Sequence, residues 1–220
     1  MKIGLQLTFC QVKLSKLSEK EKLQALNEVR ILASINNHPH IVTYKEAFLD
    51  EASQTLNLVM EFAEGGDLDA KIRRCRQQNT RIPEAEVWSL FIQLLKGLQA
   101  LHDLKIVHRD VKSANVFLTS EGRLKLGDLN VSKVAKGAGM LQTQTGTPYY
   151  CSPEVWQGKP YNFKSDVWSA GCVLYEMCEL RPPFQATSMD QLCRRCCSGV
   201  VPSLSRAYSN DLNQMVRLCL

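Results

Sequence analysis

Residues 107–115 read VHRDVKSAN, and a short distance later residues 127–130 read GDLN. Phosphoryl transfer requires metal ions held between phosphate oxygens, a hydroxyl steered in line and neutralisation of the developing charge. The two stretches supply a residue for each requirement, with Asp110 as proton acceptor, Lys112 beside the moving phosphate, and Asn115 and Asp128 as oxygen ligands of Mg²⁺. They therefore predict a phosphoryl-transfer site that binds Mg²⁺.

Further motifs stand in an order that resembles the eukaryotic protein kinases, with wording closest to the NIMA-related serine/threonine kinases. The first stretch matches the kinase catalytic loop, and Asp128-Leu129-Asn130 resembles the metal-binding triplet of the family. The other matching segments are EFAEGGDL at residues 61–68, GTPYYCSPE at 146–154, SDVWSAGC at 165–172 and the stretch 14–32. Several motifs in one order and spacing are more specific than a single short motif.

The resemblance implies an α+β fold of the bilobed protein-kinase type. Its small, β-rich N-lobe would span residues 1–62, and its mainly helical C-lobe would span residues 63–220. Both lobes are expected to be incomplete, because no Gly-rich loop precedes the first strand and the last C-lobe helices are missing. A chain of 220 residues that is 45% hydrophobic can nevertheless bury a sizeable core.

Composition favours neither nucleic acid nor a membrane as a partner. The net charge of +5 is small, and basic residues are mixed with acidic ones. No apolar run is long enough for a signal peptide or a membrane span. The nine cysteines are scattered and odd in number, which is typical of a reducing cytoplasm. Their one cluster, CRRCC at residues 193–197, lacks a second ligand pair for zinc, so we expect a cysteine-rich helix there.

Local patterns predict most of the secondary structure. Ser18 and Glu21 form a capping box for a helix over about residues 19–34, and two strands are expected over residues 40–48 and 55–62. The other expected elements are a weak strand over residues 1–9, a long amphipathic helix from Pro83, a hairpin of residues 116–118 and 123–126, a buried helix over 166–177 and two short helices after residue 184.

The resemblance also implies an ATP site where the two lobes meet. Its ATP-binding residues would be Met60, Glu61, Ala63, Asp67, Phe117 and Asp128, with Mg²⁺ held by Asn115 and Asp128. Backbone groups of Glu61 and Ala63 would bind the adenine edge. The catalytic set would be Asp110, Lys112, Asn115 and Thr147. The combination of Lys112 with Thr147 favours a serine or threonine hydroxyl over tyrosine as the acceptor.

Seven further residues are expected to support or regulate this site. They are Glu28, His108, Arg109, Lys133, Thr143, Glu154 and Asp166, and their two basic members Arg109 and Lys133 would meet a phosphate on the activation loop. Glu28 would pair with an ATP-anchoring lysine, although a helix glutamate is more often solvated. Thr143 is a phosphoacceptor candidate, with a plain loop threonine as the alternative. Asp166 would hydrogen-bond the catalytic-loop backbone, whereas Glu154 would stay buried without its usual arginine partner.

Cys10 departs from the kinase pattern, because it stands where the family has its ATP-anchoring lysine. A neutral sulfur cannot neutralise phosphate charge. Lys13 is three residues away, which on a regular strand places it on the opposite face unless a bulge re-aims it. Two functions therefore stay open, a protein serine/threonine kinase and a catalytically impaired kinase-like scaffold.

The kinase resemblance implies a protein substrate with a serine or threonine acceptor. It also makes microtubule-associated or ciliary proteins candidate partners by analogy with the family. We expect a cytoplasmic location, including association with the cytoskeleton.

Overall fold

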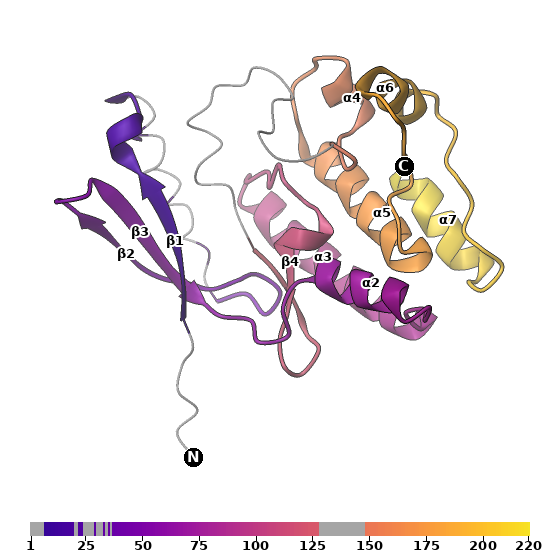
Figure 1. The fold of residues 1–220 in the computed structure, drawn as a ribbon, viewed down its shortest axis with the longest axis horizontal. Coiled ribbons are helices and arrows are strands. Elements are labelled where there is room, and N and C mark those ends of the chain that lie inside the picture. The colour runs from indigo at the N-terminus through magenta and orange to yellow at the C-terminus, as the bar shows by residue number, and fades with distance from the viewer. Residues whose placement is uncertain are drawn as a thin grey trace.

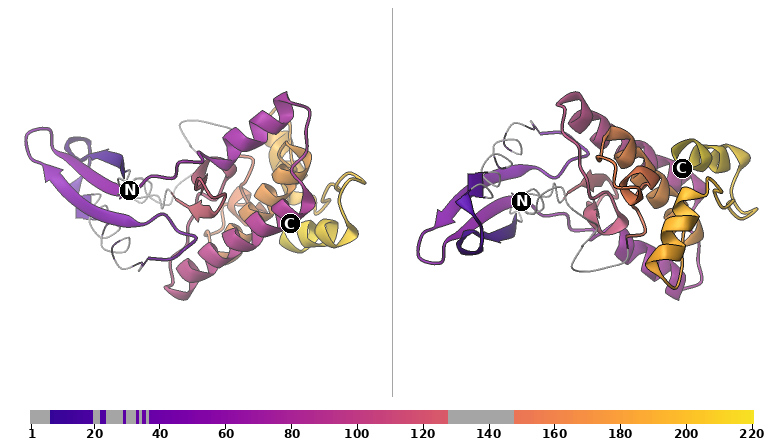
Figure 2. Two further views of the ribbon diagram at one scale, coloured as in Figure 1. Left: turned by 90° about the horizontal axis from the view of Figure 1, so that it is seen from below. Right: turned by 90° about the horizontal axis from the view of Figure 1, so that it is seen from above.

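A computed structural model describes residues 7–19, 22–23, 29, 33, 35, 37–127 and 148–220. A three-stranded sheet forms one part of the molecule, and helices with a small hairpin form the other (Figure 1). Figure 2 shows the sheet at one end and the helices at the other from two further sides. The α+β class predicted from the sequence is confirmed.

The sheet has its last strand in sequence at its centre. Strands β1 (Leu7–Lys13) and β2 (Tyr44–Asp50) both pair antiparallel with β3 (Thr55–Glu61). Residues 55–59 of β3 are all buried: the strand is paired on both sides, and its Leu56 and Leu58 pack against Val29. The strand expected over residues 1–9 instead runs from Leu7 to Lys13, and residues 1–6 lie outside the described part of the chain.

The segment before β2 connects the two parts of the molecule. A strand was expected from His40, but β2 begins at Tyr44. The backbone of residues 40–42 pairs instead with Leu126 of the hairpin: Leu126 N–H donates to His40 O at 2.9 Å, and Val42 N–H donates to Leu126 O at 2.9 Å. Residues 40–42 therefore pair through their backbone as a strand does, but they pair with β5 of the helical part and not with the sheet.

Among the described residues, the helical part contains six α-helices, one 3₁₀ turn and one hairpin. The helices are α2 (Leu68–Gln77), α3 (Glu84–Asp103), α4 (Pro153–Trp156), α5 (Phe163–Glu179), α6 (Met189–Cys197) and α7 (Asn210–Cys219). The 3₁₀ turn is η2 (Ser113–Asn115), the hairpin consists of β4 (Val116–Leu118) and β5 (Leu124–Leu126), and a second 3₁₀ turn, η1 (Leu14–Lys16), follows β1 beside the sheet. None of the helices described has the length and apolar content of a membrane span.

Helix α3 carries the apolar stripe that its sequence predicts. Val87, Phe91, Leu94, Leu98 and Leu101 follow each other at spacings of four and three, and all are at most 2% exposed. They pack in one core with α5 and α7. Helix α5 is buried along nearly its whole length, as predicted, but it begins at Phe163 because Asn162 and Ser165 form a capping box.

The segment over residues 19–34 is only partly described. Glu19, Lys22, Leu23, Val29 and Ala33 are helical, which agrees with the predicted helix. Val29 packs against the cluster of Val12, Leu14 and Leu56 in the sheet. Glu28 lies outside the described residues.

Gly97 fixes the distance between α3 and the connecting segment, and it provides a test of this packing. Alanine normally stabilises a helix interior by about 1 kcal/mol relative to glycine. Here a Cβ on Gly97 would lie 2.7 Å from His40 O, the oxygen that accepts the Leu126 N–H. We therefore expect Gly97→Ala to destabilise the protein by about 1–3 kcal/mol in urea denaturation.

The matched control is Gln99→Ala, at an exposed position of the same helix. It should change the free energy of unfolding by no more than about 0.5 kcal/mol. A stabilised Gly97→Ala variant would show that the segment can move away from α3 at no cost.

Candidate active site

Asp110 is oriented by the two neighbouring residues that the sequence grouped with it. Lys112 Nζ lies 3.0 Å from Asp110 Oδ2, and Asn115 Nδ2 donates to the same oxygen at 3.0 Å and to the Asp110 carbonyl at 2.8 Å. The Asp110 side chain is only 15% exposed, so this ion pair is partly shielded from water. The arrangement fixes one carboxylate at the point where the loop turns into η2.

The same contacts determine which atom of Asn115 can bind a cation. Its Nδ2 is used twice by Asp110, so its remaining polar atom, Oδ1, is an acceptor of the kind that Mg²⁺ binds. Asp128, the second ligand expected, lies outside the described residues. Within those residues, no three His, Cys, Asp or Glu side chains form a metal-binding group. The donor chemistry of Asn115 thus fits Mg²⁺ bound together with further ligands.

His108 connects the loop to the residue before the metal-binding triplet. Asp110 N–H lies 3.3 Å from His108 Nδ1, and His108 Nε2 lies 3.0 Å from the Gly127 carbonyl oxygen. The first contact requires Nδ1 as acceptor and the second requires an Nε2–H donor, which together describe the neutral ring. His108 is 2% exposed. It therefore braces the loop from inside, as the resemblance implies.

Asp166 is the fully buried anchor of the catalytic loop. Its carboxylate accepts the N–H groups of His108 at 2.9 Å and Arg109 at 3.0 Å. His102 Nε2 at 2.8 Å and the Tyr161 hydroxyl at 3.0 Å complete its surroundings. Arg109 has a φ of +67°, a conformation that costs a non-glycine residue about 1–3 kcal/mol. Asp166 holds the loop in this conformation by accepting the two successive N–H groups.

The variant Asp166→Asn tests this anchoring role. An asparagine has one acceptor oxygen, and its NH₂ group would face donors instead of accepting from them. We expect a loss of about 3 kcal/mol in the free energy of unfolding, measured by urea denaturation with tryptophan fluorescence. Asp103→Asn, at an exposed position at the end of α3, should have little effect. Equal midpoints for both variants would mean that the loop keeps its conformation without this carboxylate.

The residues expected to bind adenine lie where β3 leaves the sheet. Met60 and Glu61 end β3, and the buried Ala63 follows them. Among the described residues, no hydrogen bond uses the Ala63 N–H, whereas its carbonyl accepts from Gly66 N–H at 3.3 Å. A donor at this position fits the adenine edge. Asp67 has a role that the sequence analysis missed, because its Oδ1 caps α2 by accepting from Ala70 N–H at 2.7 Å.

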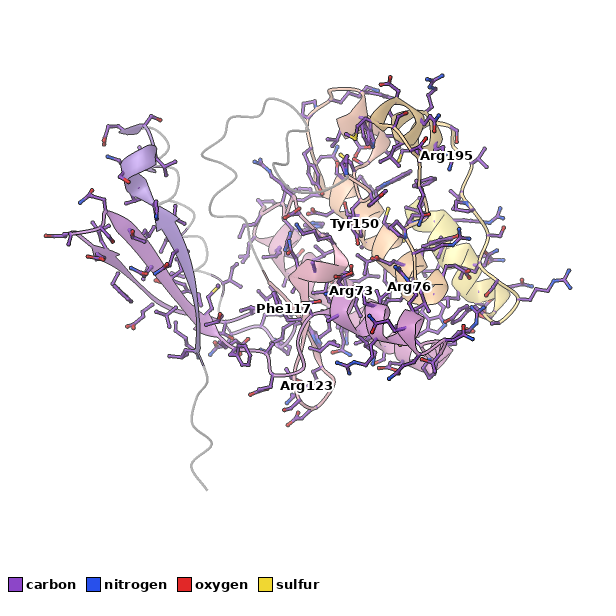
Figure 3. All side chains as sticks on the ribbon, viewed as in Figure 1. Arg73, Arg76, Phe117, Arg123, Tyr150 and Arg195 are labelled. Carbon is purple, nitrogen blue, oxygen red and sulfur yellow. The ribbon has the colours of Figure 1, made fainter. Side chains whose placement is uncertain are left out.

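Phe117 lies close to Gly127, directly before Asp128. A Cβ on Gly127 would lie 2.7 Å from the ring atom Cε2 of Phe117 and 2.9 Å from Val42 Cγ2, so only glycine fits between them. Phe117 also forms a backbone bridge with Asp67. In Figure 3 its side chain lies on the side of the helical part that faces the sheet. This position is compatible with an apolar surface beneath a nucleotide base.

Lys125 joins the two parts of the molecule through a contact that sequence reasoning did not find. Its Nζ lies 2.5 Å from Glu61 Oε1, which also accepts the Thr43 N–H at 2.8 Å. The two side chains are only 16% and 21% exposed. Because β5 and β3 are separated by more than sixty residues, no local pattern indicates this ion pair.

Glu154 corrects one expectation. It was expected to be a buried carboxylate without a partner, but it is half-buried and accepts a hydrogen bond from Ser165 Oγ. Burial alone raises the pKa of the Glu154 carboxyl, but hydrogen bonds from Ser165 and from neighbouring groups bring this pKa below its ordinary value. Ser165, in the first turn of α5, supplies a hydrogen-bond donor to this carboxylate.

Five predicted site residues, and the side chain of Cys10, cannot be placed together with these. Glu28, Asp128, Lys133, Thr143 and Thr147 lie outside the described residues, and for Cys10 only the backbone is described. Position 10 pairs with Leu58 in a register that runs without interruption from Leu7 to Lys13. Without a bulge, Lys13 and position 10 lie on opposite faces of β1, and Lys13 is exposed. Lys13 therefore does not replace the lysine that Cys10 displaces.

The cysteine cluster is helical, as expected. Cys193, Cys196 and Cys197 lie in α6, and the eight cysteines whose side chains are described are free thiols. Burial is the main cause that raises the pKa of most of these thiols, Cys196 among them. A raised pKa disfavours the reactive thiolate.

Comparisons with known proteins agree with this geometry. The protein kinase domain family matches residues 6–218 of the chain. The relatives include serine/threonine-protein kinase Nek1 of Mus musculus, 42% identical over 94% of this chain and 17% of its own length. Serine/threonine-protein kinase Nek4 of Mus musculus is 41% identical over 99% of this chain and 27% of its own length. The probable serine/threonine-protein kinase nek2 of Dictyostelium discoideum is 38% identical over 99% of this chain and 52% of its own length.

The chain thus spans between 17% and 52% of the length of these three relatives. The family match covers far more than half of the chain, and the resemblance predicted from the sequence motifs is confirmed. The chain belongs to the protein kinase domain family, and over nearly its whole length it is similar to NIMA-related serine/threonine kinases.

Proposed function

We propose that the protein containing this chain transfers the γ-phosphate of ATP to a serine or threonine hydroxyl of a protein substrate. The observation that carries the proposal is the fixed Asp110 carboxylate, held at Oδ2 by Lys112 and Asn115 at 3.0 Å each. A carboxylate in a defined orientation can accept the proton of an incoming hydroxyl.

The neighbouring residues meet the other requirements of this reaction. Lys112 is already beside Asp110 and can also neutralise charge on the transferred phosphate. Ala63 N–H can donate to the base; Met60 lies at the end of β3 just before it, and Phe117 forms a backbone bridge with Asp67 just after it. Mg²⁺, when bound, supplies positive charge between the phosphate oxygens, and the Asn115 amide oxygen together with Asp128 would hold it. The acceptor is proposed to be serine or threonine because Lys112 combines with Thr147 as in that class of kinases.

A catalytically impaired scaffold is the second candidate, and Cys10 favours it. The residue is on β1, opposite Leu58, where the family resemblance expects a lysine. A thiol cannot supply the positive charge that a lysine brings to the phosphates. In this alternative the helical part would bind partners without phosphorylating them.

An assay of the full-length protein separates the two candidates. The protein is incubated with Mg²⁺ and γ-labelled ATP and a mixture of protein substrates, and the labelled amino acids are identified after hydrolysis. Label on serine or threonine supports the proposed kinase. Label on tyrosine alone would contradict the proposed acceptor, and no label above that of a heat-inactivated sample would support the scaffold.

We further propose a cytoplasmic location, with microtubule-associated or ciliary proteins among the partners. This proposal is supported only by the analogy with NIMA-related kinases. Co-sedimentation of the full-length protein with polymerised microtubules tests it.

A further inference from the structure

Tyr150 lies where three segments of the chain meet. Its hydroxyl donates to Glu176 Oε2 at 2.7 Å, and Ser113 Oγ lies 3.0 Å from the same hydroxyl. Its carbonyl oxygen accepts from Ser169 Oγ at 2.8 Å. Figure 3 shows Tyr150 beside the upper half of α5. One tyrosine is therefore bonded to the catalytic loop through Ser113 and to α5 at two points.

The partners of Tyr150 are almost completely shielded from water. Ser113, Ser169 and Glu176 are 1%, 3% and 4% exposed. A buried polar group that loses its partner cannot turn to water instead, so a satisfied network of this kind favours one geometry. Burial raises the pKa of the Tyr150 hydroxyl, which therefore stays protonated and donates to Glu176. With that proton engaged, the hydroxyl oxygen is the acceptor for Ser113 Oγ–H.

Ser113 lies between the two residues that hold Asp110. It opens the turn η2, with Lys112 before it and Asn115 two residues after it. Asn115 N–H donates to the Lys112 carbonyl at 2.9 Å, and Gly127 N–H donates to the Asn115 carbonyl at 3.0 Å. A shift of Ser113 would therefore move both donors of the Asp110 carboxylate and the residue before Asp128.

We propose that Ser113 and Tyr150 are positioning residues, which couple the packing of segment 148–152 against α5 to the orientation of Asp110. The inference rests on the proposed kinase function for its kinetic consequence, but the coupling itself is a property of the fold. Among the described residues, segment 148–152 is hydrogen-bonded to the catalytic loop at Ser113, whose Oγ lies 3.0 Å from the Tyr150 hydroxyl oxygen. The Glu176 carboxylate accepts the hydrogen bond that this hydroxyl donates and so fixes its orientation.

The kinetic test uses Ser113→Ala and Tyr150→Phe in the full-length protein. Each variant should lower kcat by about tenfold and leave KM for ATP within about twofold, because orientation at the reacting centre is lost while nucleotide contacts remain. The double variant should be no slower than the slower single variant, since both remove the same bond. Tyr149→Phe removes the neighbouring hydroxyl and should leave kcat within about twofold. Unchanged kcat, a change in KM alone, or multiplicative losses would overturn the proposal.

A conservative pair at Glu176 separates positioning from general packing. Glu176→Gln keeps an acceptor for the Tyr150 hydroxyl, whereas Glu176→Met fills a similar volume without one. We expect Glu176→Gln to retain most of kcat and Glu176→Met to behave like Tyr150→Phe. Equal losses in both variants would show that the charge or the packing of Glu176 matters, and not the hydrogen bond, which would overturn the proposal.

Amide hydrogen exchange tests the coupling without any need for activity. The Asn115 and Gly127 amides should exchange about tenfold faster in Tyr150→Phe and Ser113→Ala than in the unsubstituted protein, and at the same rate in Tyr149→Phe. If the unsubstituted protein transfers no phosphate, the proposed function fails, and exchange alone decides on the coupling. Exchange at unchanged rates in both variants would overturn it.

Discussion

The Asp110→Asn variant of the full-length protein is expected to lose about a thousandfold in the rate of phosphoryl transfer. The carboxylate oxygen Oδ2 accepts from Lys112 Nζ and Asn115 Nδ2, both at 3.0 Å. An amide at this position either turns its NH₂ group toward these two donors or gives up the orientation they impose. In both cases the site loses the negative charge that accepts the proton of the hydroxyl.

The measurement is the initial rate of label transfer to a serine- or threonine-containing protein, with nucleotide binding followed separately. Asp110→Asn should still bind ATP with Mg²⁺, because the residues expected to contact the base are unchanged. Asp211→Asn, an equal loss of charge on the exposed first turn of α7, serves as the control. Equal labelling by Asp110→Asn and the unsubstituted protein would mean that the activity comes from a contaminating kinase.

The elements that the sequence predicted well are those whose signal is local. The stripe from Val87 to Leu101 repeats within one helix, and the hairpin of β4 and β5 is closed by a few polar residues. Asp110, Lys112 and Asn115 are also close in sequence, so their convergence follows from a single loop. Local spacing is sufficient in these cases because the partners are at most a few turns apart.

The features that were missed or mistaken depend on partners far along the chain. Lys125 reaches Glu61, and the Ser165 hydroxyl reaches Glu154. The backbone of residues 40–42 pairs with β5 and not with the sheet. Nothing near Glu154 in sequence indicates that the Ser165 hydroxyl will donate to it, so this carboxylate was expected to be unpaired. A position alone does not specify which remote group satisfies a buried polar atom.

Asp67 shows a local signal that was available but outweighed by the resemblance. An aspartate directly before a helical segment is a preferred N-cap, and Asp67 Oδ1 accepts from Ala70 N–H at 2.7 Å. The resemblance to kinases instead implied that Asp67 binds ATP. The helix cap and the kinase resemblance concern the same side chain, and the hydrogen bond to Ala70 N–H fixes where its carboxylate lies.

The second large effect is expected from restoring a lysine at position 10. Cys10→Lys should raise kcat/KM for ATP by about a hundredfold, because a positive charge aimed at transferring phosphates contributes on this scale. Position 10 lies in β1 opposite Leu58, in register with the strand that ends at Met60 and Glu61. Val12, on the same face of β1, belongs to the cluster that packs against Val29. The face that carries position 10 therefore lies toward Val29.

This geometry supplies a matched pair of controls. Lys13→Met should leave kcat/KM unchanged, because Lys13 is exposed on the opposite face of the strand. Glu28→Gln should have little effect beside Cys10, but it should remove most of the gain in the Cys10→Lys variant, where the carboxylate has a lysine to orient. Such non-additivity is the signature of two side chains in contact.

The outcomes of the two experiments together distinguish the candidate functions. If Cys10→Lys gains activity that Asp110→Asn removes, position 10 limits a catalytic loop that is otherwise competent, and the thiol accounts for a weak kinase. If Cys10→Lys binds ATP no better and gains no activity, position 10 of β1 does not correspond to the ATP-anchoring lysine, despite its register with β3. The ordered Asp110 loop would then need another source of positive charge, and Lys112, 3.0 Å from Asp110, is the nearest described cation that can provide it.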